Sequence, residues 1–385
     1  MNPVNLLFEA SDRAISGVDT RFVRPQISWL DQEERLIGIK GSRGVGKTTL
    51  LLQYAATRSF KGSVLYASLD NIYFADNRLF DFADSFYKNG GELLLLDEVH
   101  HYPTWSVELK NIYDSLPGLK VVYTGSSLLH LTKGRTDLSR RSVNYTLPGL
   151  SLREFINLSA KTEFPAFELQ KILNHHGQIA GEISGQIRPV KWFNDYLEFG
   201  FYPFFLEGTG NYQKKLNEVI LHILETDLPY TTSIGYAQVQ KLKQLLYVIS
   251  ESAPFKPNIV KLSERTGISR NTLKDYLHHL DDALLIQLLF SSGKGMSRFS
   301  KPEKIFLHHP NIMKALTGDL ANRGSVRETF FFNQLSYVHS VNYTKQGDFL
   351  VDDRWTFEVG GKNKTKGQIV HVPDSFLALD ELERG

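Results

Sequence analysis

Residues 41–51 read GSRGVGKTTLL, and the fold is decided by this stretch and by the segments on either side of it. The preceding residues 35–39 are apolar and partly β-branched, which predicts a buried strand. The following residues 49–56 predict a helix. The stretch matches G-x-x-x-x-G-K-[ST] at each fixed position from Gly41 to Thr48. Strand, glycine-rich loop and helix in this order are the context that a phosphate-binding P-loop (Walker A motif) requires.

Each residue type in this loop has a role in phosphate binding. Glycines allow backbone torsions that aim several N–H groups at one anion, and the helix N-terminus adds the positive end of its dipole. Lys47 is expected to contact the β- and γ-phosphates of ATP, and the Thr48 hydroxyl to bind Mg²⁺. The alternative is a glycine-rich turn that binds no ligand. The residues expected to hold the nucleotide are Gly41, Ser42, Arg43, Gly44, Val45, Gly46, Lys47, Thr48 and Thr49.

An acidic pair follows a second predicted strand, in the stretch GELLLLDE at 91–98. Four consecutive leucines predict a strand that is buried on both faces, as in a parallel sheet. Asp97 lies at its carboxyl end, where open α/β sheets bind ligands, and is expected to hold Mg²⁺ directly or through water. Glu98 is a candidate general base for the attacking water. By itself the stretch indicates only a strand end with a solvated acidic pair. After a P-loop, it indicates a Walker B motif.

Two further segments, 64–69 and 120–125, predict strands of the same sheet, so the expected fold class is α/β with a parallel P-loop sheet. The second segment is followed by Ser126, whose hydroxyl would lie beside the γ-phosphate. Alternatively, Ser126 and Ser127 cap a helix that starts there. The sequence leaves both interpretations open.

In this order and at these spacings, GSRGVGKT, LLLLDE and VVYTGSS resemble the AAA+ superfamily of ATPases. More narrowly, the chain resembles a bacterial and archaeal family of ATP-binding proteins that joins an AAA domain to a C-terminal domain often called DUF4143. The matching stretches are YASLDN (66–71), LLLLDEVHHYPTWSVELKNIYD (93–114), TGSSLLHL (124–131) and LPGLSLREF (147–155). The resemblance covers most of the chain and implies an ATP hydrolase that uses Mg²⁺. We therefore predict ATP hydrolysis coupled to domain rearrangement.

The resemblance also implies an arginine finger before the last strand of the sheet, which is predicted at 142–147. Arg135, Arg140 and Arg141 precede this segment, and Arg140 or Arg141 is the best candidate by position. A finger that acts on a neighbouring subunit requires a homo-oligomer. The alternative is a solvated basic helix end, which the helix dipole favours. The catalytic residues expected overall are Lys47, Glu98, Ser126, Arg140 and Arg141.

Pattern changes along the chain predict four parts. They are an ATPase core at 1–150, a mostly helical region at 151–235, a winged helix-turn-helix domain at 236–292 and a nuclease-like domain at 293–385. The family resemblance implies that the helical region is a lid over the nucleotide, and the alternative for its aromatic patch at 196–208 is a packing cluster between helices.

The third part has a helix at 259–266, a tight turn and a second helix at 270–280, which is the helix-turn-helix pattern. Residues 282–290 resemble the strand of a wing. DNA is therefore a candidate partner, although such modules also serve only for packing within larger ATPases. The residues that would face a DNA groove are Arg270, Asn271 and Lys274.

The fourth part resembles the restriction-endonuclease-like, PD-(D/E)xK fold. Its chemistry needs carboxylates on Mg²⁺ and a lysine near the attacking water, for which Glu328, Asp348, Glu358 and Lys362 are the candidates. The sequence departs from the E-x-K spacing, because Val-Gly-Gly separates Glu358 from Lys362. We expect a scaffold that does not cut DNA efficiently. The alternative function for the whole chain is an ATP-dependent DNA-processing enzyme.

Composition adds general limits. The hydrophobic share of 42% and the charged share of 22% are ordinary for a soluble globular protein, and a net charge of +2 neither requires nor excludes nucleic acid. The absence of cysteine excludes disulfides and thiolate metal sites. The sequence has neither an apolar run of about 18 residues nor a basic start followed by an apolar stretch. We therefore expect no membrane helix, no signal peptide and a cytoplasmic location.

Overall fold

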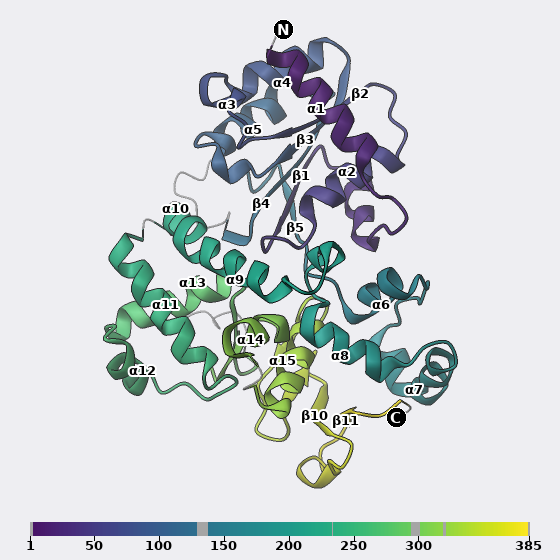
Figure 1. The fold of residues 1–385 in the computed structure, drawn as a ribbon, viewed down its shortest axis with the longest axis vertical. Helices are drawn as coiled ribbons and strands as arrows, with labels where there is room; N and C mark the ends of the chain where they lie inside the picture. The colour runs from purple at the N-terminus through teal and green to yellow at the C-terminus, as the bar shows by residue number, and fades with distance from the viewer. Residues whose placement is uncertain (1–2, 129–137, 233, 294–300, 319–320, 384–385) are drawn as a thin grey trace. The chain divides into compact units, whose positions relative to one another are not determined.

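The computed structural model describes residues 3–128, 138–232, 234–293, 301–318 and 321–383, which form two compact units (Figure 1). The first unit comprises Met1–Gly149 and Asp227–Ser233, and the second comprises Leu150–Thr226 and Ile234–Gly385. A short segment thus belongs to the first unit although the chain on both sides of it belongs to the second. The finer division into four parts stays a prediction.

A parallel five-stranded sheet in the order β2-β3-β4-β1-β5 forms the centre of the first unit. Its strands are β1 (Leu36–Gly41), β2 (Ser63–Ser68), β3 (Gly91–Asp97), β4 (Lys120–Ser126) and β5 (Val143–Thr146). The parallel α/β sheet predicted from the sequence is confirmed. Because β4 lies between β1 and β3 and all strands point the same way, Gly41, Asp97 and Ser126 end at the same edge.

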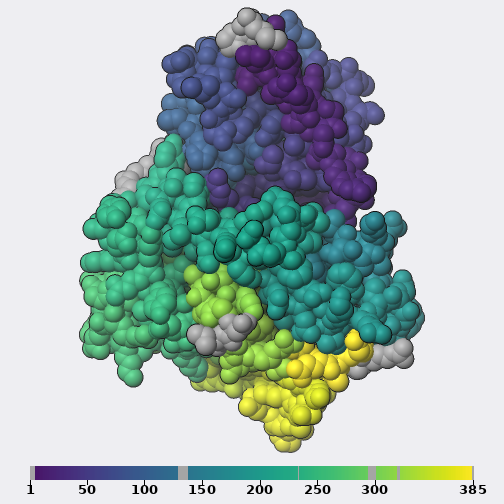
Figure 2. All heavy atoms as spheres, in the orientation of Figure 1, coloured from purple at the N-terminus to yellow at the C-terminus, as the bar shows by residue number. Residues whose placement is uncertain are grey.

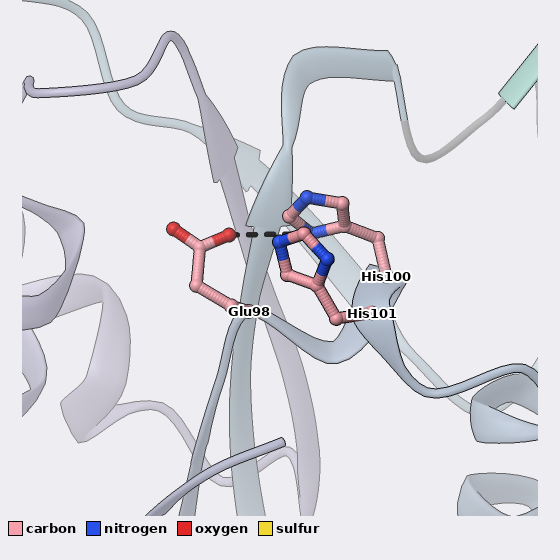
Figure 3. A group of neighbouring side chains, drawn as sticks. All are labelled: Glu98, His100 and His101. Atoms are coloured by element: carbon pink, nitrogen blue, oxygen red, sulfur yellow. Dashed lines mark ion pairs between the residues drawn. The ribbon is translucent and has the colours of Figure 1, made fainter. Parts of the chain in front are cut away.

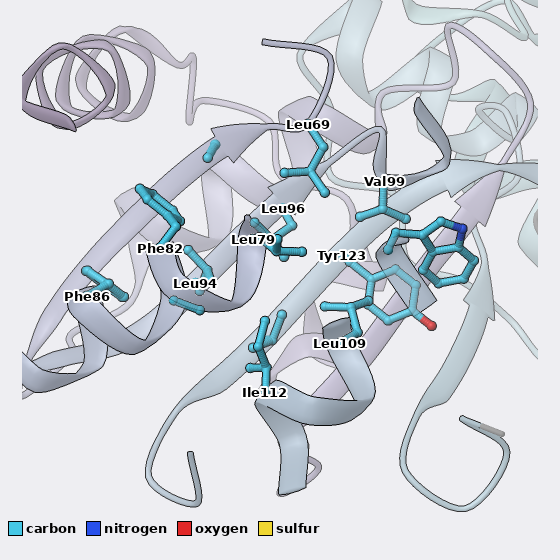
Figure 4. Packing of buried hydrophobic residues seen from close by; sticks show 14 of the residues in the cluster. Leu69, Leu79, Phe82, Phe86, Leu94, Leu96, Val99, Leu109, Ile112 and Tyr123 are labelled. Atoms are coloured by element: carbon cyan, nitrogen blue, oxygen red, sulfur yellow. The ribbon is translucent and has the colours of Figure 1, made fainter. Parts of the chain in front are cut away.

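Helices cover this sheet. They are α1 (Pro3–Gly17), α2 (Lys47–Thr57), α3 (Tyr73–Asp76), α4 (Leu79–Lys88) and α5 (Trp105–Ser115), with 3₁₀ turns η1 (Pro25–Asp31) and η2 (Val99–His101). A further helix, α10 (Leu228–Thr232), belongs to the same unit. Figure 4 shows Phe82 and Phe86 of α4 and Leu109 of α5 packed against Leu94 and Leu96 of β3. Burying each such side chain contributes about 1.5–3 kcal/mol. This layer fixes the position of β3 and therefore of the acidic pair at its end.

The edge strand β2 is covered by α1, whose atoms are visible along the surface of the first unit in Figure 2. Ser11 of α1 is buried, and its Oγ accepts a hydrogen bond of 2.9 Å from the Tyr66 N–H of β2. A helix over an edge strand protects backbone groups that would otherwise pair with another chain.

The first half of the second unit is helical, as the sequence predicts. Its elements are α6 (Leu152–Ala160), α7 (Leu169–Ser184), α8 (Pro189–Phe199), η4 (Pro203–Glu207), α9 (Tyr212–His222), a π-helical turn η5 (Ile223–Asp227) that leads into the first unit, and α11 (Tyr236–Ser250).

The remainder of this unit is mixed. Its elements are α12 (Ile259–Thr266), α13 (Arg270–Asp282), β6 (Ile286–Leu289), β7 (Lys304–Leu307), α14 (Pro310–Thr317), α15 (Arg323–Ser336), β8 (Val341–Asn342), β9 (Phe349–Val351), β10 (Trp355–Gly361), η8 (Lys366–Gln368) and β11 (Ser375–Asp380). β6 and β7 form an antiparallel pair, and a separate mixed sheet has the order β11-β10-β9-β8. Within the described ranges no helix combines the length and the apolar character needed to cross a bilayer.

A fully buried asparagine connects several segments of the second unit. Asn311 Nδ2 donates to the carbonyl oxygens of Tyr196 and Leu197 at 3.0 and 2.7 Å. Its Oδ1 accepts from the Phe201 N–H at 2.9 Å and from the Tyr212 hydroxyl at 2.8 Å. One amide therefore satisfies four polar groups at the end of α8 and on α9, where water would not reach them.

We predict that Asn311→Ala lowers the free energy of unfolding by about 3 kcal/mol or more, because several buried polar groups lose their partner at once. Urea unfolding followed by circular dichroism measures the change. Asn174→Ala, at an exposed position on α7, is the matched control and should stay within about 0.5 kcal/mol of wild type. Equal midpoints for the two variants would contradict this role.

Candidate nucleotide-binding site

The P-loop glycines each have a structural reason. Gly44 and Gly46 have φ of 83° and 94°, in the left-handed region that glycine adopts without strain. A Cβ on Gly41 would lie 2.5 Å from the Leu147 carbonyl oxygen, so no side chain fits there. Helix α2 begins immediately afterwards at Lys47. The backbone therefore has the loop-then-helix form that an anion-binding nest requires.

Lys47 is the buried cation of this loop. Its Nζ donates to the carbonyl oxygens of Gly41 and Ser42, both at 3.1 Å. Burial lowers the pKa of Lys47. The nearby carboxylates that oppose this lowering belong to Glu98, Asp97 and Asp227. A phosphate would supply the ammonium with stronger, charged acceptors than these two carbonyls.

The other loop residues differ in exposure. Val45 is buried, and its carbonyl accepts from Arg24 Nη1 at 3.3 Å. Arg24 also donates to the carbonyls of Pro148 and Gly149 at 2.8 and 3.0 Å, so this buried arginine ties the loop to the end of the first unit. Sequence reasoning missed it. Ser42 is buried, whereas Arg43 and Thr49 are exposed.

Asp97 is only 3% exposed and accepts hydrogen bonds from three hydroxyls. Thr48 Oγ1 donates at 2.6 Å, the Tyr66 hydroxyl at 2.9 Å, and Thr124 Oγ1 contacts the second carboxylate oxygen. Burial, with the Asp97 charge second, raises the pKa of Tyr66, which keeps that phenol a neutral donor. The carboxylate of Asp97 and the hydroxyl of Thr48 are hard oxygen donors and fit Mg²⁺.

Glu98 has an unusual backbone conformation. Its φ and ψ are 51° and 43°, a left-handed conformation that costs a non-glycine residue on the order of 1–3 kcal/mol. The Glu98 N–H donates to Thr124 Oγ1 at 3.1 Å. The turn aims its carboxylate at His100, with 3.2 Å between Oε2 and Nδ1, and His101 lies beside them (Figure 3). Sequence reasoning missed these histidines, although His100 and His101 follow the predicted Walker B pair after a single residue, Val99.

Ser126 lies opposite Gly41 in the register of β4 and β1, at the edge where the P-loop begins. Its Oγ accepts from the Leu128 N–H at 3.3 Å, which is a local capping contact. Phosphate sensing and capping are both compatible with this geometry.

Of the three finger candidates, Arg141 is held within its own unit, because its Nε lies 2.8 Å from Asp114 Oδ1. Arg140 is exposed, and Arg135 lies outside the described residues.

The segment that joins the first unit from far along the chain contacts this site. Asp227 is 4% exposed, and its carboxylate is close enough to influence the Lys47 ammonium. Tyr230 of α10 packs its ring 6.5 Å from that of His101, measured between centroids. Sequence reasoning placed both residues in a lid region and contained no signal for this contact.

In the second unit, α12 and α13 lie within two residues of the expected helix-turn-helix segments. Arg270, Asn271 and Lys274 are exposed, but so are Glu264 and Asp275 on the same two helices. Exposed side chains of both charges therefore lie on these two helices, and a winged helix that binds DNA stays a prediction.

The carboxylates of the expected nuclease-like centre are held by lysines. Lys304 Nζ lies 3.0 Å from Glu328 Oε2 and 3.8 Å from Asp348 Oδ1. Burial raises the pKa of Glu328, which Lys304 partly opposes. Glu358 is 2% exposed, and its Oε1 lies 2.5 Å from Lys364 Nζ.

The sequence left open whether Lys362 shares a face with Glu358, and the structure pairs Glu358 with Lys364 instead. Lys362 is exposed, because the chain turns after β10 and brings Lys364 back instead. The missing side chain of Gly360 makes the room, since a Cβ there would lie 2.6 Å from Lys364 Cβ.

We predict that this centre leaves plasmid DNA intact in the presence of Mg²⁺ or Mn²⁺ and ATP, since ammonium groups hold the oxygens that a metal would need. Gel electrophoresis of the plasmid is the measurement, with Glu358→Ala as the control. Cleavage by the wild type that disappears in this variant would refute the prediction.

Comparisons with known families support a P-loop ATPase domain in the first unit. Residues 33–156 match a family model described as "AAA domain", and residues 190–323 match one described as "Domain of unknown function (DUF8612)". The second match overturns the expected resemblance of the C-terminal part to DUF4143. Together with the loop geometry, the first match identifies an AAA-type P-loop domain in this chain.

An uncharacterized protein of Methanocaldococcus jannaschii is 27% identical over 292 residues, which are 71% of this chain and 61% of that protein's length. AMPPCP-bound DnaA from Aquifex aeolicus is 15% identical with a TM-score of 0.29, over 73% of this chain and 89% of DnaA. The RuvB Holliday junction branch migration motor of Thermotoga maritima is 14% identical with a TM-score of 0.31, over 76% and 88%.

Proposed function

We propose that this protein binds ATP with Mg²⁺ at the P-loop, hydrolyses it with Glu98 as the base, and couples nucleotide occupancy to the arrangement of its second unit. The observation that carries the proposal is the 2.6 Å hydrogen bond between Thr48 of the P-loop helix and Asp97 at the end of β3. It brings the two expected metal ligands together at the edge where the loop lies.

Each residue then has a distinct task. Lys47 exchanges its two backbone carbonyls for phosphate oxygens, which raises its number of charged acceptors. Thr48 and Asp97 hold Mg²⁺, which when bound neutralises charge on the phosphates. Glu98, 23% exposed at its side chain, accepts a proton from the attacking water. Arg140, exposed and near the last strand, is the finger that we propose for a neighbouring subunit in a homo-oligomer.

We predict that Glu98→Gln leaves ATP binding intact and slows hydrolysis by roughly a hundredfold or more, as loss of a general base does. Lys47→Ala should instead abolish most ATP affinity, and Lys61→Ala, an exposed lysine of the same unit, should change neither quantity. Calorimetry measures binding, and phosphate release measures hydrolysis. If Glu98→Gln hydrolyses ATP at the wild-type rate, Glu98 is not the base. If Lys47→Ala binds ATP with wild-type affinity, the P-loop is not the nucleotide site.

The coupling rests on the segment Asp227–Ser233. It belongs to the first unit, yet residues 226 and 234 belong to the second, so any displacement passes along the chain in both directions. Asp227 places a carboxylate near the ammonium that is expected to bind phosphate. ATP brings further negative charge to the same ammonium and repels Asp227. Two like charges at short range repel each other by a few kcal/mol near a protein surface. Repulsion between the phosphates and Asp227 would therefore favour displacement of α10.

We predict that Asp227→Asn tightens ATP binding by about tenfold, which corresponds to ~1.4 kcal/mol of removed repulsion. ADP, which lacks the γ-phosphate, should gain less. The variant should also lose the ATP-dependent change in amide hydrogen exchange that we expect in α11, the helix that follows the segment.

The control is Glu225→Gln, which removes a carboxylate of the same π-helical turn that pairs with Lys243. It should leave ATP affinity unchanged. Asp227→Asn with wild-type affinity and a wild-type exchange response would sink the coupling proposal while leaving ATP hydrolysis untouched.

A further inference from the structure

We propose that Glu98, His100 and His101 form a second cation site, for a transition metal such as Zn²⁺, and that occupancy of this site stops ATP hydrolysis. The metal site stands on its own geometry. Only its effect on hydrolysis rests on the function proposed above, because that effect requires Glu98 to be the base.

The three side chains converge within a single turn. Figure 3 shows the three side chains close to one another. One nitrogen from each histidine and one carboxylate oxygen of Glu98 all lie within 4.8 Å of one another. The Glu98 Oε2 to His100 Nδ1 distance is 3.2 Å. Ligand atoms of a tetrahedral zinc ion, with bonds of about 2.1 Å, are about 3.4 Å apart. Small side-chain rotations therefore suffice to enclose a cation.

The backbone presents these ligands without needing an ion. Glu98 takes the left-handed conformation, and η2 follows at once, closed by hydrogen bonds of 3.0 Å from His101 N–H to Glu98 O and from Tyr102 N–H to Val99 O. His100 is 2% exposed, and its ring centroid lies 4.2 Å from that of His101. Ligands that are held by a rigid turn and by burial lose little entropy on binding.

The donor set selects the class of cation. Two imidazole nitrogens and one carboxylate suit Zn²⁺, Co²⁺ and Ni²⁺, whereas Mg²⁺ prefers oxygen ligands of the kind that Asp97 and Thr48 offer. Three protein ligands leave one tetrahedral position for water. The two cations of this edge are therefore distinguishable by chemistry.

The local charge balance favours a second cation. The charges that act on Lys47 are those of three carboxylates, Glu98, Asp97 and Asp227, and of one further cation, Arg43. With Lys47 protonated, three negative charges therefore stand against two positive ones, which favours a divalent cation nearby.

Occupancy changes the chemistry of Glu98. A carboxylate that binds a divalent cation is a weaker base and is held away from the attacking water, so proton transfer is slowed while the P-loop stays free for ATP. The site would thus make hydrolysis, but not nucleotide binding, sensitive to a transition metal.

Binding is tested on tag-free, chelator-treated full-length protein without nucleotide, by titration with Co²⁺ followed by visible absorption and with Zn²⁺ followed by calorimetry. We expect one equivalent of Co²⁺ to produce ligand-field bands. Zn²⁺ should compete with Co²⁺ for the same site and remove these bands. His101→Gln and Glu98→Gln should each weaken binding by at least about tenfold. The matched control is His175→Gln, which alters the exposed pair His175-His176 on α7. No bands, or equal affinity in His101→Gln and His175→Gln, would overturn the site.

The effect on hydrolysis is measured as the ratio of ATPase rates with and without Zn²⁺, at fixed excess Mg²⁺, for each variant against itself. Wild type and His175→Gln should be inhibited at the Zn²⁺ concentration that fills the site, and His101→Gln should need at least about tenfold more. Zn²⁺ binding without inhibition would overturn the regulatory half of the proposal. Hydrolysis absent from the wild type with Mg²⁺ and without Zn²⁺ would instead count against the ATPase, and the Co²⁺ titration would still decide the metal site.

Discussion

The buried carboxylate of Asp97 is the constraint on which the rest of the site depends. A charge this far from water is expensive unless polar partners surround it. Here the three partners are hydroxyls of Thr48 on α2, Tyr66 on β2 and Thr124 on β4. One side chain thereby joins the P-loop helix to both neighbours of its own strand. Removal of any one partner would leave the charge short of a donor, so the loop, the sheet edge and the acidic pair are positioned together.

Glu98, the residue after Asp97, adopts a strained backbone conformation at this point. With Asp97 held inside, the chain has to leave β3 sharply, and Glu98 takes up the left-handed turn. Thr124 serves both residues, because its hydroxyl contacts Asp97 and accepts from the Glu98 N–H. The strained turn is therefore supported from β4, and the Glu98 carboxylate is directed towards His100 rather than into solvent. The backbone thus orients this side chain before any ligand binds.

Local signals explain how much could be predicted from the sequence. The glycines of the P-loop and the leucine run 93–96 determine backbone form and burial within a few residues, so β1, α2 and β3 fall close to their expected bounds. Contacts across the sheet or along the chain do not leave such signals. Tyr66 reaches Asp97 only because β2 lies next to β3 in the sheet. Asp227 comes near Lys47 only because a segment from far along the chain belongs to the first unit. The pairing of Glu358 with Lys364 could not be predicted, because the turn that follows Gly360 and Gly361 has no periodic pattern from which the direction of a side chain could be inferred.

Thermodynamic reciprocity applies to the segment Asp227–Ser233, which belongs to the first unit between two parts of the second. If ATP binding changes the position of Asp227 and α10, then a partner that fixes the second unit in one arrangement must change ATP affinity by the same factor. The coupling needs no contact between that partner and the P-loop, since the chain itself enters and leaves the segment from the second unit. Under the proposed coupling, the size of the effect would be bounded by the competition between the Asp227 carboxylate and the phosphates for the buried Lys47 ammonium, on which Glu98 and Asp97 also act. A single charge would then relate the nucleotide to the arrangement of the second unit.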